Sequence, residues 1–202
     1  MIKFVVFDVM GVVFEVGDDV EGLLIPYIRS LKPDTEPRYI RETYLAASLG
    51  VLPSHEFWAK LGFPKARIPE IEQYYLEKAF TLDAGFLPCA EALRRHYRIA
   101  LLSNDVSEWS RYLRRFHKIE PLLTAAFISG DLGVRKPDPQ IYRMVLEALG
   151  VQPWECVLID DYPERVEAAL YLGFSAILFD RAGHNCRGLR VSSFGQLTQL
   201  LL

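Results

Sequence analysis

Polar side chains that could together bind a metal ion and an anion occur after several short apolar runs and before one helix start. They are Asp8 after a first run, Ser103 and Asn104 after a second, Asp160 and Asp161 after a third, and Lys136 in the segment Arg135-Lys136-Pro137. Carboxylates are the ligands of hard cations, whereas a hydroxyl, backbone N–H groups and a lysine suit phosphate oxygens. Each residue alone is ordinary as a helix cap or a surface charge. Their combination predicts one anion and metal site.

The apolar runs that precede these residues have the length and composition of buried strands. Four runs, at residues 4–7, 99–102, 157–159 and 176–179, are fully apolar, and a weaker run covers residues 126–128. Fully apolar runs suit parallel strands that are covered on both faces. In open α/β sheets, ligands bind beyond the carboxyl ends of the strands, and most of the polar residues fall there.

Helical segments alternate with these runs and have recognisable ends. Asp138 can cap a helix that has Pro139 in its first turn and that Gly150 ends. Pro163 begins another helix, which Gly173 ends. The alternation predicts a doubly wound, mostly parallel, Rossmann-like α/β sheet.

Residues 16–82 interrupt the alternation, because they contain no convincing strand and indicate about four helices. Pro37 begins one helix that Gly50 ends, and Ser54 is expected to cap another that Gly62 ends. We therefore expect a helical insertion over the sheet, directly after the first strand.

Composition and charge narrow the classes of partner. Half of the chain is apolar and 24% is charged, which is ordinary for a globular protein, and the net charge of −3 indicates neither nucleic acid nor an anionic membrane as partner. The three cysteines (Cys89, Cys156 and Cys186) are widely spaced, so we expect no disulfide or structural zinc and a cytoplasmic location. The first apolar run is too short for a signal peptide or a membrane span.

Four segments carry a resemblance to haloacid dehalogenase-like (HAD) hydrolases. FDVMGVV (residues 7–13) resembles the family's first motif, hhhDxDGhh, and LLSN (101–104) resembles the second, a strand that ends in Ser or Thr. GVRKPDPQIY (133–142) is similar to the third motif, and IDDYPERVEAA (159–169) to the fourth, hDDxxxNVxAA. The segments occur in the family's order and at similar spacing, so the resemblance covers the whole chain.

The resemblance implies a hydrolase, specifically a phosphoric monoester hydrolase that acts on a small phosphorylated substrate. Asp8 would be the nucleophile that forms an aspartyl-phosphate, which water then hydrolyses. Ser103 and the backbone N–H of Asn104 would bind the phosphoryl oxygens. Lys136 would balance the charges of Asp8 and the phosphate.

The resemblance also implies a cofactor and a domain arrangement. Mg²⁺ would be held by Asp8, by the main-chain carbonyl of Met10 and by Asp161, with Asp160 assisting directly or through water. The helical insertion would be the family's small cap. The expected domains are thus an α/β core of residues 1–15 and 83–202, and an α-helical cap of residues 16–82.

Two positions depart from the family pattern. Met10 stands where most family phosphatases carry a second aspartate, which protonates the leaving oxygen, and a thioether carries no proton at neutral pH. Another acid near the cap hinge could substitute, and the candidates are Glu15, Asp18 and Asp19. Arg165 replaces the usual Asn or Asp of the fourth motif, which would alter the orientation of Asp161.

Three functions are compatible with Met10. The first is a phosphatase that is slow or acts on esters whose leaving groups need little protonation. The second is a haloacid dehalogenase, because a halide leaves without a proton, although that branch lacks the acidic pair found here as Asp160-Asp161. The third is a catalytically silent protein that binds phosphate and metal. The sequence favours the phosphatase, and it indicates neither the substrate nor the oligomeric state.

Overall fold

The computed structural model describes residues 1–181, 183 and 188–202. Cys186 lies outside the described residues, whereas Cys89 and Cys156 are buried free thiols. Within the described part of the chain, every helix is too short or too polar to cross a membrane.

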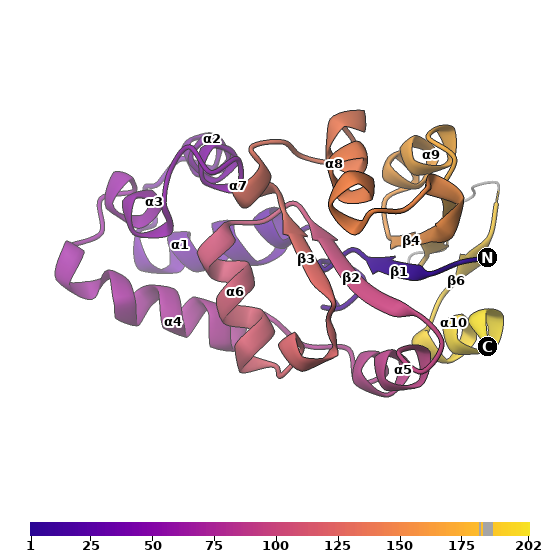
Figure 1. Cartoon of the computed structure of the whole chain (residues 1–202). Helices are drawn as coiled ribbons and strands as arrows, with labels where there is room; N and C mark the ends of the chain where they lie inside the picture. The colour runs from indigo at the N-terminus through magenta and orange to yellow at the C-terminus, as the bar shows by residue number, and fades with distance from the viewer. Residues whose placement is uncertain (182, 184–187) are drawn as a thin grey trace.

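Six parallel strands form one sheet in the order β3-β2-β1-β4-β5-β6, which confirms the predicted fold class (Figure 1). The strands are β1 (Phe4–Phe7), β2 (Arg98–Ser103), β3 (Ala125–Ile128), β4 (Cys156–Asp160), β5 (Ser175–Phe179) and β6 (Arg190–Val191). Sequence analysis missed β6, because two residues give no periodic pattern. β1 lies in the middle, so Phe7 pairs with Leu101 on one side and with Ile159 on the other.

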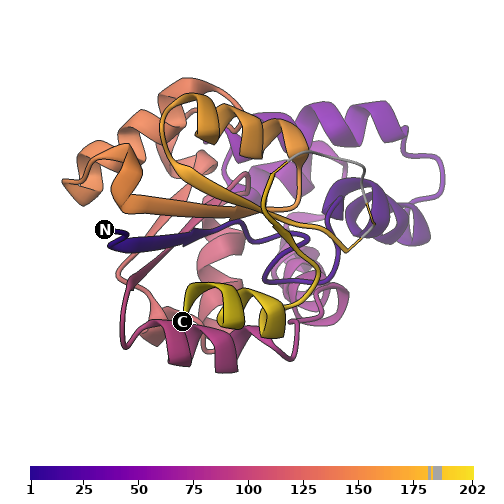
Figure 2. The same cartoon turned by 90° about the vertical axis from the view of Figure 1, so that its right-hand side faces the viewer.

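Helices cover both faces of the sheet, which explains why the strands are fully apolar. Val5 and Phe7 of β1 belong to one hydrophobic core, and Phe4 and Val6 belong to a second core on the opposite face. Figure 2 shows α8 and α9 on one face, and α5 and α10 on the other. The bounds are α5 (Phe86–Leu93), α6 (Ser107–Phe116), α7 (Ser129–Leu132), α8 (Pro139–Leu149), α9 (Pro163–Tyr171) and α10 (Phe194–Leu201), with short 3-10 turns η3 (Glu120–Leu122) and η4 (Pro153–Glu155).

Local signals set the ends of α8. Asp138 caps this helix by accepting a hydrogen bond from the Gln140 N–H at 2.8 Å, and Gly150 ends it with a left-handed backbone. The prediction for Ser54 is wrong. Ser54 is the first residue of its helix and its side chain caps nothing there, because its hydroxyl donates instead to Glu72.

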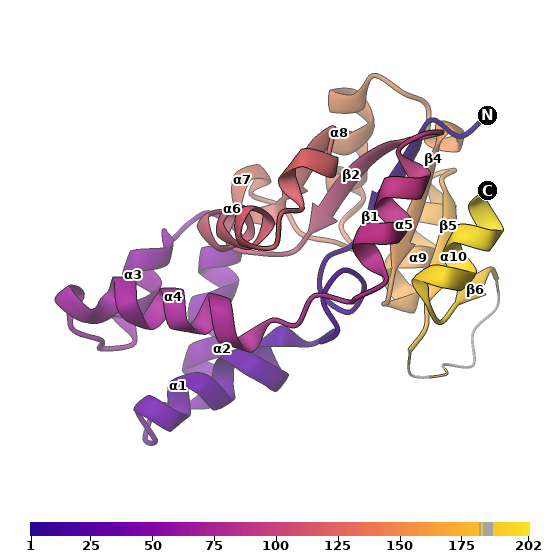
Figure 3. The same cartoon turned by 90° about the horizontal axis from the view of Figure 1, so that it is seen from below.

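The helices between β1 and α5 form a separate group beside the sheet (Figure 3). They are η1 (Val20–Leu24, a π-helix), α1 (Ile25–Leu31), α2 (Pro37–Ser48), α3 (Ser54–Lys60), η2 (Lys65–Arg67, a 3-10 turn) and α4 (Ile68–Ala79). The group contains no strand among its described residues. We propose that residues 16–82 form the cap domain and that the rest of the chain forms the core domain.

One half-buried carboxylate connects this helical group to the core. Glu72 Oε2 on α4 accepts hydrogen bonds from the indole N–H groups of Trp58 on α3 and Trp109 on α6, both at 2.7 Å. Both tryptophans are almost fully buried. An indole N–H has no alternative partner in an apolar surrounding, so the two bonds fix the cap helices against α6.

Replacement of Glu72 by alanine should therefore destabilise the fold. Two buried donors would lose a charged acceptor, and we expect the free energy of unfolding to fall by about 2 to 4 kcal/mol in urea denaturation. Glu72→Gln keeps one acceptor oxygen and should cost clearly less. Equal losses for the two variants would show that the shared oxygen is not what holds the indoles.

Candidate active site

The Asp8 carboxylate lies just beyond the carboxyl end of β1, almost completely buried. Its backbone N–H continues the sheet by donating to the Ile159 carbonyl at 2.8 Å. Oδ1 accepts from the Val9 N–H at 2.7 Å and lies 2.8 Å from Lys136 Nζ, while Oδ2 lies 2.9 Å from Arg165 Nη1. Each carboxylate oxygen of the predicted nucleophile is thus oriented by its own cation, Oδ1 by Lys136 and Oδ2 by Arg165.

Lys136 reaches Asp8 because Asn104 holds its backbone. The Lys136 N–H donates to Asn104 Oδ1 at 2.8 Å, and Asn104 Nδ2 donates back to the Lys136 carbonyl at 2.9 Å. The buried Nζ lies between Asp8 Oδ1 and Asp160 Oδ2, the latter at 2.5 Å. The Asn104 side chain is therefore used to position the lysine, which sequence analysis did not foresee.

Ser103 ends β2 with a buried hydroxyl that has no hydrogen-bond partner among the described residues. An unsatisfied buried hydroxyl costs free energy, so such a group is suited to bind a ligand or a water molecule. Ser103 lines a cavity of about 180 Å³ together with Asp8, Met10, Asn104 and residues of the cap. An oxyanion in this cavity would satisfy the hydroxyl.

Three carboxylates meet beside this cavity, as the sequence predicted. Asp8, Asp160 and Asp161 each offer one oxygen, and these oxygens all lie within 4.8 Å of one another. Asp161 Oδ1 is buried and lacks a hydrogen-bond partner among the described residues. Its other oxygen is enclosed by two glycines, since an added Cβ would come within 1.9 Å of it at Gly11 and 2.6 Å at Gly17. This donor set fits a hard divalent cation such as Mg²⁺.

Arg165 occupies a position in this cluster that the sequence did not predict. Its Nη1 lies 2.9 Å from Asp8 Oδ2, 3.5 Å from Asp160 Oδ1 and 3.9 Å from Asp161 Oδ1. The guanidinium also stacks on the ring of Tyr162, 4.1 Å from its centroid. The sequence analysis expected Arg165 to affect only the orientation of Asp161, whereas the shortest contact of Arg165 is to Asp8. Its place in the first turn of α9, four residues after Asp161, was the signal that could have indicated this.

The charges of the cluster do not balance. Burial alone raises the pKa of Asp8, but Lys136 and Arg165 outweigh burial and the pKa of Asp8 is lowered. Burial raises the pKa of Asp160, and it raises that of Asp161 to about 8, with the Asp8 charge adding to both shifts. Two cations thus keep Asp8 ionised without fully compensating three carboxylates, and a further cation would favour ionisation of all three.

Met10 lies at the same cavity but brings no acid to it. The residue is buried and is among those that line the cavity, and its side chain carries no titratable proton. Arg135, next to Lys136 in the chain, also lines the cavity, which sequence analysis missed. Its guanidinium donates to Ser48 Oγ and lies over the ring of Tyr44, 5.7 Å from the centroid.

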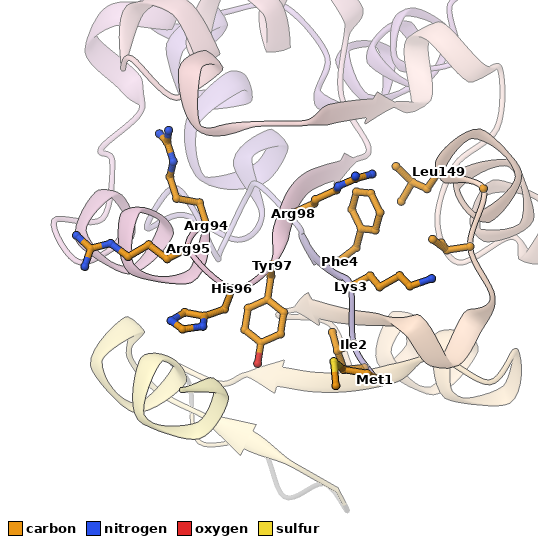
Figure 4. A pocket seen from close by; sticks show the side chains of 12 residues that line it. Met1, Ile2, Lys3, Phe4, Arg94, Arg95, His96, Tyr97, Arg98 and Leu149 are labelled. Atoms are coloured by element: carbon orange, nitrogen blue, oxygen red, sulfur yellow. The ribbon is translucent and has the colours of Figure 1, made fainter.

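A larger hollow of about 560 Å³ lies at the opposite, amino-terminal end of β1 and β2 (Figure 4). Basic side chains surround it, but Lys3 pairs with Glu155 at 2.6 Å, and Arg94 and Arg95 point away from Phe4 in the figure. None of the unpartnered buried polar atoms of the described residues lines it. The candidate site is therefore the smaller cavity at Asp8.

The chain is similar to known hydrolases. The family model described as haloacid dehalogenase-like hydrolase matches residues 2–173. A phosphoserine phosphatase of Thermus thermophilus is 38% identical over 93 residues, which cover 46% of this chain and 37% of that protein. The chain spans about half, or less, of the length of this and of two further curated relatives.

Solved structures share the fold at low sequence identity. A HAD family enzyme of Bacteroides thetaiotaomicron, in complex with magnesium and inorganic phosphate, superimposes with a TM-score of 0.71 at 20% identity, over 92% of this chain and 97% of that one. A 2-haloacid dehalogenase of Pseudomonas syringae gives a TM-score of 0.74 at 17% identity, over 100% and 98%.

The position of Arg165 predicts a competition with metal. A divalent ion that binds Asp8, Asp160 and Asp161 must displace the guanidinium from between them, so Arg165→Asn should bind Mg²⁺ at least about tenfold more tightly, a difference of about 1.4 kcal/mol. Titration calorimetry without substrate measures this. Arg143→Asn, which changes an exposed arginine of α8, should leave the affinity unchanged. Weaker binding by Arg165→Asn would contradict the competition.

Proposed function

Because the chain belongs to the haloacid dehalogenase-like hydrolase family, we propose that it is a magnesium-dependent phosphatase of a small phosphorylated metabolite. One observation carries this proposal. The ionised Asp8 and the Ser103 hydroxyl, which has no hydrogen-bond partner among the described residues, line the same small cavity, and the buried Lys136 contacts Asp8 beside three clustered carboxylates. This combination suits transfer of a phosphoryl group to Asp8 and then to water.

The residues of this chain suggest how the reaction would proceed. Lys136 would hold Asp8 as a carboxylate during the reaction, as Arg165 also does before a divalent ion takes its place, so that Asp8 can attack phosphorus. The Ser103 hydroxyl and the Asn104 backbone N–H would bind the equatorial phosphoryl oxygens. Lys136 would offset the negative charge that the phosphate adds. The walls of the cavity, which come from both cap and core, would keep bulk water from the substrate.

Magnesium fits the donor set and the charge of the site. Asp8, Asp161 and the Met10 main-chain carbonyl would hold it, with Asp160 directly or through water. When bound, Mg²⁺ would neutralise charge on the carboxylates and on the phosphoryl oxygens. Two cationic side chains already face three carboxylates, so a phosphate dianion would enter a site with an excess of negative charge. That excess favours a divalent cation as cofactor.

One observation favours haloacid dehalogenation as a second candidate. Arg165 places a positive charge on Asp8 without a metal, and a leaving halide would need no proton from the Met10 position. The buried pair Asp160 and Asp161 argues against this candidate, because a metal site would serve no purpose without phosphate.

A screen with and without Mg²⁺ tests the two candidates. We expect the protein with Mg²⁺ to hydrolyse acetyl phosphate and p-nitrophenyl phosphate faster than sugar phosphates, since good leaving groups need little protonation. EDTA should abolish this activity, and Asp8→Asn should lower it by at least about 1,000-fold because the nucleophile is lost.

The other outcomes of the screen are equally specific. Metal-independent release of chloride from 2-chloropropionate, with no phosphatase activity, would identify a dehalogenase. If phosphate and Mg²⁺ bind but neither substrate class turns over, the protein is a catalytically silent binder and the phosphatase proposal is wrong.

A further inference from the structure

The proposed phosphatase needs a proton donor for esters with poor leaving groups, and Met10 cannot supply one. We propose that Asp19 is the catalytic general acid and base of this site, and that it stands in for the acid missing at position 10. This inference rests on the proposed function. It assigns a residue of the cap hinge to the reaction itself, whereas sequence analysis left three candidates open.

The location of Asp19 is the first argument. It precedes η1, at the point where the chain enters the helical group, and it lines the same cavity as Asp8, Ser103 and Arg165. Its residue surface is only 7% exposed, although the surrounding loop lies at the surface. Asp19 therefore lines the cavity that a substrate on Asp8 would occupy.

The second argument is an unused hydrogen-bonding atom. Asp19 Oδ2 is buried and has no hydrogen-bond partner among the described residues. A buried carboxyl oxygen without a partner is costly unless a ligand or a water molecule meets it. A leaving oxygen in the first half-reaction, and a water molecule in the second, would satisfy this atom.

The other acids near the cavity are excluded by their positions. Glu15 is exposed and does not line the cavity. Asp18 is exposed, and its Oδ1 accepts the N–H of Glu21 at 3.0 Å. Asp160 and Asp161 belong to the carboxylate cluster around Arg165. Among the described residues, Asp19 is thus the one buried acid of the cavity that has no other task.

The surroundings of Asp19 favour its protonated form near neutral pH. Burial raises the pKa of Asp19 to about 7. Its own backbone N–H and Arg135 oppose the rise, whereas the nearby carboxylates of Asp18 and Asp8 add to it. A general acid is most efficient when its pKa lies near the working pH.

Further titratable groups near Asp19 are Asp105, Tyr44 and Tyr75. Their raised pKa values favour their neutral forms. Burial raises the pKa of Asp105 to about 8, with Asp19 adding to the shift, and Asp105 Oδ2 likewise has no hydrogen-bond partner within the described part of the chain. Burial also raises the pKa of Tyr44 and of Tyr75 far above the usual range, so both stay neutral. The acid is therefore backed by neutral groups near pH 7.

The proton balance of the two half-reactions is complete with Asp19. An oxygen of Asp8 forms a bond to phosphorus as the ester P–O bond breaks, and the leaving oxygen keeps that electron pair and takes the proton of Asp19. In the second half, Asp19 accepts a proton from water as the water oxygen bonds to phosphorus. The P–O bond to Asp8 breaks, Asp8 regains its carboxylate, and inorganic phosphate leaves.

The variant Asp19→Asn tests this role, because it should affect different kinetic constants with different substrates. With glycerol 2-phosphate, whose leaving group is an alkoxide, kcat/KM should fall about 100-fold or more. With acetyl phosphate, kcat/KM should change less than about threefold while kcat falls, because only hydrolysis of the aspartyl-phosphate needs the base. Mass spectrometry of quenched samples should find the phosphoryl group accumulating on Asp8.

Two further readouts keep the test independent of folding. In the wild type, kcat/KM for glycerol 2-phosphate should decline as pH rises through about 7, since the acid must be protonated, and kcat/KM for acetyl phosphate should not. Adding Met10→Asp to Asp19→Asn should restore turnover of glycerol 2-phosphate. Glu15→Gln, which changes an exposed acid of the same segment, should behave as the wild type.

The failures are distinguishable. If the wild type hydrolyses neither substrate with Mg²⁺, the proposed phosphatase function is wrong, and the role of Asp19 falls with it. If the wild type hydrolyses acetyl phosphate but folded Asp19→Asn matches it with both substrates, the phosphatase stands and Asp19 is not its acid. Equal losses with both substrates in kcat/KM, without rescue by Met10→Asp, would likewise overturn the assignment.

Discussion

The Asp8 carboxylate is buried, and its negative charge persists only because two cations reach it from distant segments. Lys136 and Arg165 contact its two oxygens at 2.8 and 2.9 Å. A lone ionised carboxylate in such a place would take up a proton, because burial disfavours charge. The fold must therefore bring β1, the segment before α8 and the start of α9 to one point for Asp8 to exist as an anion.

The parallel sheet meets this requirement through its strand order. β1 lies between β2 and β4, so Asp8, Ser103 and Asp160 end neighbouring strands at the same edge. Lys136 comes from outside the sheet, and the two hydrogen bonds between its backbone and Asn104 fix it there. Hydrophobic cores on both faces hold the strands in register, which gives the charged groups a rigid support.

The helical group completes the site from the other side and changes its chemistry. The first-strand motif has lost its second acid, while the fourth motif has gained a cation at Arg165. Both changes face the same small cavity, which is closed in part by the chain that leads into η1. Residues outside the four motifs thus also line the cavity, because the cap hinge lies as near to it as the motif residues do. The motifs alone indicate only that an acid is missing at position 10, whereas the structure points to Asp19 as its substitute.

The sequence by itself determined five of the six strands, the ends of several helices and the segments that would meet, because apolar periodicity, proline and glycine act locally. It also identified Met10 and Arg165 as departures. Only the tertiary structure decided that Arg165 contacts Asp8, that the Asn104 side chain positions Lys136, and that Asp19 is buried while Asp18 and Glu15 are exposed. These facts depend on side-chain directions and on packing between elements far apart in the chain, which no local pattern encodes.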